Sequence, residues 1–146
     1  MTNRIEKTVE LAAPVGRVWM ALTDYTQFCS WFRAKLDGPF APGKTVRGHS
    51  TYPGHEDAQF EIVVQKMEPE RLFSFTWPAY ADCPDETCHT LVEFTLVASP
   101  TGTLLKIVES GFDKVSAARR LEVFRDNDGG WSIQINNVAE YLRHAA

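Results

Sequence analysis

Two residues of the sequence, Glu109 and His49, have the side chains needed for acid–base chemistry in an enclosed site. A general acid or base is a carboxyl or imidazole group beside the substrate, with its pKa moved toward neutrality. Glu109 alternates with Leu105 and Ile107, which predicts that the three side chains share the buried face of a strand. A buried carboxylate is costly unless it is paired or bound. Two interpretations stay open: Glu109 and His49 act as an acid–base pair, or Glu109 pairs with a structural arginine or lies at a cavity mouth.

A second group of reactive side chains, Cys83, Cys88 and His89, follows the pattern C-x4-C-H in a polar segment. A structural zinc site needs four ligands, commonly in closely spaced pairs, and this segment offers too few. The sequence therefore predicts no metal site and no cofactor. Together with Cys29 the cysteines are odd in number, which predicts free thiols in a reducing compartment. We therefore expect a cytoplasmic protein.

Length and composition describe a globular chain. Its 146 residues suit one domain over 1–146, and 44% of them are hydrophobic. The net charge of −4 argues against nucleic acid and anionic membranes, which need clustered Lys and Arg. No apolar run approaches the ~20 residues of a membrane helix, and the polar residues 1–7 contain no signal-peptide core. We expect no membrane insertion, and either a monomer or a homodimer.

Hydrophobic periodicity predicts the elements that must position these side chains. Period-two alternation marks strands, whereas apolar residues at three- and four-residue spacing mark helices. Asp128 is the expected N-cap of a terminal helix, whose stripe comprises Trp131, Ile135, Val138 and Leu142. In chain order we expect a strand at 5–11, helices at 15–22 and 25–32, a loop at 36–44, strands at 44–52, 59–67, 71–77, 89–98 and 103–110, and the terminal helix.

This order predicts an α+β fold in which a curved antiparallel sheet wraps around the terminal helix. A helix of ~16 residues spans about 24 Å, and a strand of roughly 7 residues spans a similar length. The helix can therefore lie along the concave face, above a hollow that large side chains would fill and that small or polar ones would leave open as a pocket. Taken singly, each aromatic residue is better explained as ordinary core, whereas the polar residues His49 and Glu109 in the same rows favour a site. The expected ligand-binding residues are Trp31, His49, Tyr52, Phe60, Ile62, Phe73, Phe75, Trp77, Glu109, Trp131 and Ile135.

Short motifs spread over most of the chain resemble those of a known family. The motifs, in chain order, are Ala13-Pro14, Val18-Trp19, Leu22-Thr23-Asp24, Trp31-Phe32, Met67-Glu68-Pro69, Arg71-Leu72, Thr76-Trp77, Leu91-Val92, Gly102-Thr103, Glu109-Ser110-Gly111-Phe112 and Gly129-Gly130-Trp131. Together they resemble the activator of Hsp90 ATPase homologues of the START/Bet v 1-like (SRPBCC) superfamily. The resemblance implies the helix-grip fold, with a hydrophobic cavity between the sheet and the last helix. It does not imply one reaction, because function depends on the site and not on the fold.

Three functions follow from this sequence. The first is a binding protein for an apolar or aromatic small molecule, lipid-like or polyketide-like. The second is an enzyme of the cyclase or dehydratase kind, with Glu109 or His49 as acid–base. The third is a co-chaperone-like interaction protein that uses the terminal helix or residues 78–87 as its contact surface.

Overall fold

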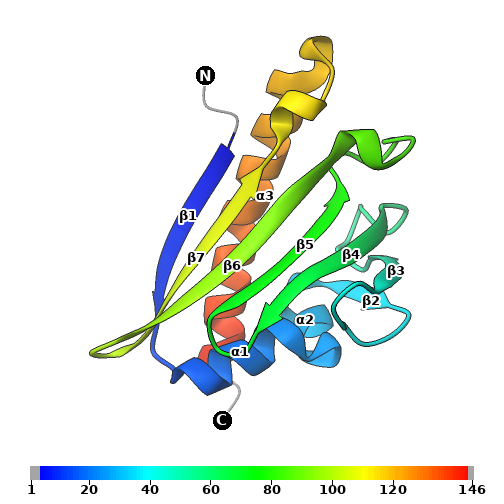
Figure 1. The fold of residues 1–146 in the computed structure, drawn as a ribbon. Coiled ribbons are helices and arrows are strands. Elements are labelled where there is room, and N and C mark those ends of the chain that lie inside the picture. Colours follow the sequence, from blue (N-terminus) through cyan, green and yellow to red (C-terminus); the bar gives the residue numbers. More distant parts are fainter. Residues whose placement is uncertain (1–3, 145–146) are drawn as a thin grey trace.

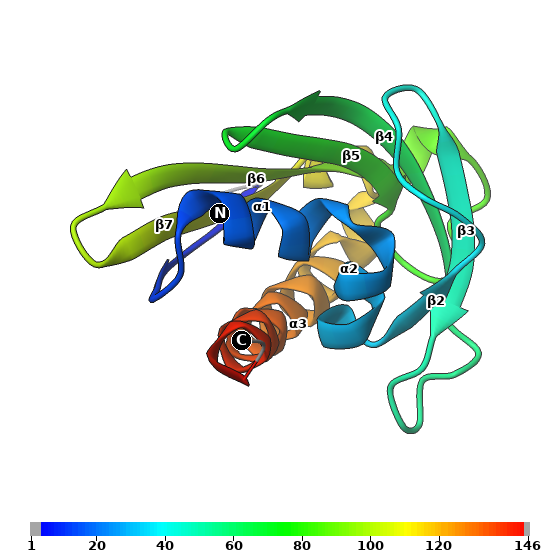
Figure 2. The same ribbon diagram turned by 90° about the horizontal axis from the view of Figure 1, so that it is seen from below.

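A seven-stranded antiparallel sheet curves around one long helix (Figures 1 and 2). The computed structural model describes residues 4–144. Its sheet has the order β1-β7-β6-β5-β4-β3-β2, so the first strand pairs with the last. The arrangement confirms the predicted helix-grip fold. The elements are β1 (Arg4–Leu11), α1 (Val15–Thr23), α2 (Tyr25–Phe32), β2 (Ala34–Leu36), β3 (Thr45–Ser50), β4 (Gln59–Glu68), β5 (Leu72–Pro78), η1 (Glu86–Cys88), β6 (His89–Ser99), β7 (Gly102–Ser110), η2 (Phe112–Lys114) and α3 (Ala117–His144).

The strands agree with the alternation in the sequence. In β5, Phe73 and Phe75 are buried, and Phe75 contacts Trp77 edge to face at 5.3 Å, so all three lie on one face. Strand β2 was not predicted, because three residues are too few to show a period. Arg33, with φ of 63°, turns the chain from α2 into β2. Gly48 of β3 then permits the two strands to approach, since an added Cβ would overlap the Lys35 carbonyl oxygen.

Helix α3 is longer than the sequence predicts, and Asp128 is not its N-cap. The helix has 28 residues from Ala117 to His144 and runs without a break through Gly129 and Gly130. The Arg120 guanidinium links its first turn to the preceding segment by donating to the carbonyl oxygens of Phe112, Asp113 and Val115, at 3.0–3.3 Å. Asp128 instead forms an ion pair with Lys7 of β1 at 2.9 Å. Packing of the buried stripe therefore outweighs the low helix propensity of two glycines.

Helix α3 offers a first prediction. A Cβ added at Gly129 would meet nothing within 4 Å. Because alanine removes backbone entropy from the unfolded chain, Gly129→Ala is expected to raise the free energy of unfolding by about 0.5–1 kcal/mol. Urea unfolding followed by circular dichroism measures this change. The matched control is Gly102→Ala, where φ is +155° and an added Cβ would overlap the Leu11 carbonyl oxygen, so that variant should be destabilised.

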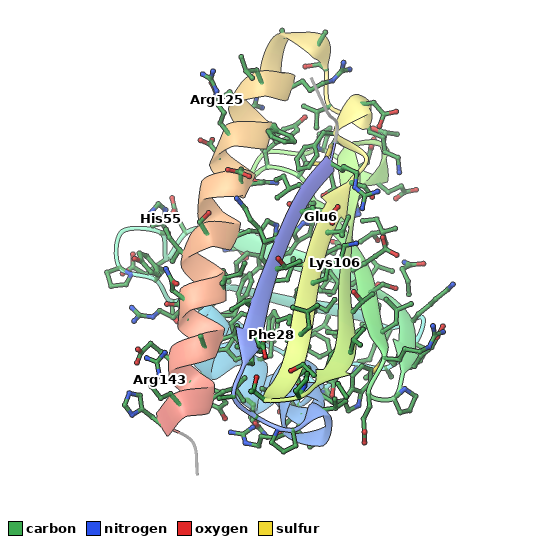
Figure 3. The ribbon with its side chains drawn as sticks, turned by 90° about the vertical axis from the view of Figure 1, so that its left-hand side faces the viewer. Glu6, Phe28, His55, Lys106, Arg125 and Arg143 are labelled. Carbon is green, nitrogen blue, oxygen red and sulfur yellow. A yellow bond between two sulfur atoms is a disulfide. The ribbon has the colours of Figure 1, made fainter. Side chains whose placement is uncertain are left out.

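The two short helices pack beside α3 at one end of the sheet (Figures 1 and 2). The Trp31 indole of α2 is buried and donates to the Ala21 carbonyl oxygen of α1 at 2.8 Å, which joins the two helices. Phe28 is fully buried and stacks on Phe32, with ring centroids 4.7 Å apart. Figure 3 shows Phe28 pointing into the space between α3 and the sheet, and Glu6 and Lys106, which form an ion pair, on neighbouring strands.

The cysteines differ from the prediction of free thiols. Cys83 and Cys88 form a disulfide across the β5–β6 connection, and Cys29 is free and half-buried. Spacing alone could not show this, because the loop geometry decides whether two sulfurs meet. Bonded sulfurs are not thiolates, so the metal interpretation of the C-x4-C-H segment loses two donors, and the cysteine argument for a reducing compartment no longer holds. Over residues 4–144, the helices are too short or too polar to span a bilayer.

Candidate functional site

A buried carboxylate lies in the packed core between α3 and the sheet. Glu109 of β7 is completely inaccessible to solvent. The indole nitrogens of Trp77 and Trp131 donate to its two oxygens, each at 2.9 Å. The Thr90 hydroxyl donates a short hydrogen bond to Oε2, and the Asn127 amide donates to both oxygens at 3.2 and 3.3 Å. The partners of Glu109 are therefore neutral donors from β5, β6 and α3, not a structural arginine.

The same surroundings perturb the acidity of Glu109. Desolvation by burial raises the pKa of its carboxyl group above the usual value of 4.5, and the hydrogen bonds from Thr90, Trp77, Trp131 and Asn127 oppose that rise. Desolvation is the larger effect because burial penalises the charged form most strongly where solvent is absent. Elevated pKa values occur at functional sites.

An open groove lies beside this carboxylate. Its inner part has a volume of about 180 Å³. It continues into a wider outer part of about 730 Å³ and a side branch of about 170 Å³. Phe60 lines all three parts. The residues around the inner part are Phe32, Phe60, Trp77, Asp126, Asn127, Gly130, Trp131 and Gln134.

Four of the eight residues that line the inner part are aromatic. Phe60, Trp77 and Trp131 lie nearly parallel, with interplanar angles of 15° and 26° and centroids 6.1 and 5.7 Å apart. Phe32 stands across them, at 72° to Phe60 and 57° to Trp77. Gly129 and Gly130 border the outer part, and a Cβ added at either residue would meet nothing within 4 Å. Figure 3 shows Arg125 and His55, which also border the outer part, on the same side of α3.

The structure brings part of the predicted site together. Phe60, Trp77 and Trp131 line the inner groove, and Tyr52 borders its outer part. Glu109 lies behind Trp77 and Trp131 and does not border the groove. The remaining aromatic and aliphatic residues predicted here lie elsewhere: Ile62, Phe73 and Phe75 in the fully buried core, Ile135 packed partly against that core, and Trp31 beside a separate cleft at the end of α3.

His49 does not reach the groove. It pairs with Gln59 in β4, whereas its neighbour Gly48 pairs with Phe60, whose ring borders the groove. Because side chains alternate across a strand, His49 faces the opposite side of the sheet. Its Nδ1 lies 3.0 Å from the Ser50 carbonyl oxygen. The predicted pairing of His49 with Glu109 is therefore wrong, and the weak pattern of this strand explains the slip by one residue.

Sequence reasoning missed several groove residues. Phe32, Asn127, Gly130 and Gln134 all border the inner part. Phe32 was assigned to a helix without a role. Asn127 precedes the predicted start of the helix, and Gly130 lies at that start. Gln134 lies within the predicted helix but outside its apolar stripe. A continuous helix would have placed Asn127, Trp131 and Gln134 on one face, because they are separated by four and three positions.

Solved structures show which folds resemble this one. DynU16, a protein in the dynemicin biosynthetic locus, matches with a TM-score of 0.75 at 23% identity over 99% of this chain, which spans only 48% of DynU16. MLL2253 from Mesorhizobium loti matches with a TM-score of 0.79 at 23% identity, covering 98% of each chain. The Aha1 dimer from Colwellia psychrerythraea matches with a TM-score of 0.75 at 15% identity, covering 97% of this chain and 96% of that chain. At these identities the likeness establishes the fold alone.

The sequence comparisons identify the family. A search of curated proteins found no significant match. The family model described as "Activator of Hsp90 ATPase homolog 1-like protein" matches residues 12–143, which is most of the chain. That stretch includes α1 and α2, every strand from β2 to β7 and nearly all of α3. The chain therefore belongs to the activator of Hsp90 ATPase homolog 1-like family.

Proposed function

We propose that residues 1–146 form one small-molecule binding domain whose groove takes an apolar or aromatic ligand. The observation that carries the proposal is the inner groove of about 180 Å³, which has four aromatic residues in its wall and opens outward. Ligand sites are typically concave and mostly apolar, with a few polar groups that fix orientation. Asn127 and Gln134 supply such groups here. The description of DynU16 as a protein in a biosynthetic locus agrees with a role in handling a small organic molecule.

The enzymatic alternative has weaker support in this geometry. A general acid or base must come within hydrogen-bond reach of the substrate. Trp77, Asn127 and Trp131 separate Glu109 from the groove, and His49 faces away from it. Binding therefore explains the site without a catalytic group at its surface. One of the similar structures is the Aha1 dimer. A homodimer therefore remains one of the two oligomeric states that we propose for this chain, beside the monomer.

The test uses 4-tert-butylphenol, a small neutral aromatic probe, and the emission of the four tryptophans. We expect saturable quenching, because Trp77 and Trp131 border the inner groove. Gly130→Leu places a side chain in that space and should weaken binding at least about ten-fold, a loss of ~1.4 kcal/mol. The matched control is Asn136→Leu, on an exposed position of α3 outside the groove.

Circular dichroism should show both variants folded. The Asn136→Leu protein should bind like the original chain. A folded original chain that does not bind the probe, or binding that Gly130→Leu leaves unchanged, would overturn the proposal.

A further inference from the structure

We propose that the ligand of this groove is an organic cation whose ammonium group lies in the inner part, against Trp77, Trp131 and Phe60. The inference rests on the proposed binding function and names the chemical class of the ligand. It follows from an inventory of the hydrogen-bond donors, acceptors and charges that border the inner groove.

Most hydrogen-bond donors that border the inner groove are engaged within the protein. The indole N–H groups of Trp77 and Trp131 both donate to Glu109. The Asn127 amide nitrogen has two hydrogens, and it donates to the Ala79 carbonyl oxygen at 3.2 Å and to Glu109. The Gln134 amide nitrogen donates one of its two hydrogens to the Phe32 carbonyl oxygen at 3.0 Å, and the Gln134 amide oxygen accepts from Asn137 at 3.1 Å. A ligand that needs donors, such as a carboxylate or phosphate, would find few here.

Apart from the second hydrogen of the Gln134 amide nitrogen, the groups left for a ligand are acceptors. The orientation of the Asn127 amide follows from chemistry, because a flipped amide would set its oxygen against two other acceptors. Within residues 4–144, the Asn127 Oδ1 atom then has no hydrogen-bond donor. The exposed residue Asp126 borders both the inner and the outer part of the groove, and within the same residues its carboxylate forms no ion pair or hydrogen bond. No Lys, Arg or His residue borders the inner part.

The aromatic wall adds a second attraction for positive charge. Ring faces carry negative potential and bind ammonium groups, most strongly on tryptophan. Hydrogen bonds from both indoles to the Glu109 carboxyl group polarise the rings further, because linked hydrogen bonds polarise one another. Arg125 and His55 border only the outer part. They would therefore meet the other end of the ligand.

Three probes of nearly equal shape and different charge test the inference. They are (4-hydroxyphenyl)trimethylammonium, 4-tert-butylphenol and 4-hydroxybenzenesulfonate, whose tetrahedral ends are positive, neutral and negative. Dissociation constants come from isothermal titration calorimetry at one pH and ionic strength. The cation should bind about three- to thirty-fold more tightly than the neutral probe, the range expected for cation–π attraction. The sulfonate should bind most weakly.

A variant without the negative charge of Asp126 tests whether the cation binds close to that side chain. Asp126→Asn should weaken binding of the cation by about two- to five-fold and leave the neutral probe unchanged. Asp113→Asn, in η2 and outside the groove, makes the same change in net charge and should affect neither probe. Neutral binding at least as tight as cation binding would overturn this inference while the proposed function stands. If the folded chain binds none of the three probes, both fail.

Discussion

Replacement of Glu109 by alanine is expected to lower the free energy of unfolding by about 3–5 kcal/mol, the cost of removing one partner from a buried charged or polar network. The carboxyl group is fully buried and accepts from Trp77, Thr90, Asn127 and Trp131. Alanine leaves these donors without an acceptor and opens a cavity beside them. Urea unfolding at constant pH measures the change. A loss below about 1 kcal/mol, the size of an ordinary surface effect, would show that the network is not a structural centre.

The pH dependence of the free energy of unfolding separates the effect of the Glu109 charge from the effect of its shape. Because the pKa of Glu109 is raised in the folded protein, the folded state holds a proton that the unfolded state has released. The stability that this proton contributes is fully present below pH 4.5, the usual pKa of a glutamate carboxyl group. It is lost as the pH rises through the raised pKa of the folded state. Glu109→Gln does not titrate. The stability of the original chain relative to Glu109→Gln should therefore fall as pH rises above 4.5, and a constant or rising difference would contradict the assigned direction.

A comparably large loss is expected for Trp131→Ala, about 3–5 kcal/mol, as for other large-to-small changes in a core. Trp131 is nearly fully buried and contacts Trp77 and Phe94, with centroids 5.7 and 5.9 Å away. Trp131→Phe keeps a ring there but removes the donor to Glu109, and should cost about 1–3 kcal/mol. Chemical denaturation of both variants tests whether Trp131→Ala is the more destabilising of the two.

A double-mutant cycle then tests whether the indole acts through the carboxylate. Trp131→Phe and Glu109→Ala remove opposite ends of one hydrogen bond of 2.9 Å. Their combined effect should differ from the sum of the single effects by about 0.5–3 kcal/mol, as for residues in contact. Strict additivity would mean that Trp131 stabilises the fold by packing alone.

More of the fold than of the candidate site could be predicted from the sequence. Alternation in the strands and two short helices before them determine the order of elements, and the motifs spread along the chain point to the same architecture. The burial of Glu109 could also be predicted from the sequence, because Leu105 and Ile107 share its face. Its partners were not. They come from β5, β6 and α3, and nothing in the local sequence states which distant donors meet one carboxylate.

The errors have physical causes that can be named. His49 was placed inward because β3 has a weak pattern, in which Gly48 and not a large apolar residue marks the inner face. Helix α3 was begun too late because Gly129 and Gly130 resemble a helix boundary, although tertiary packing carries the helix through them. The disulfide was missed because five positions of separation do not determine whether Cys83 and Cys88 meet.

The pairing of β1 with β7 has a consequence for how this protein reaches its final form. Ile5 lies opposite Glu109, so this edge of the sheet joins segments that are far apart along the chain. Contacts between distant segments slow folding, because loop-closure entropy is lost before they form. During synthesis, β1 must therefore wait for nearly all other strands to leave the ribosome before its partner exists. Protection of the β1 amides against hydrogen exchange should consequently appear last during refolding.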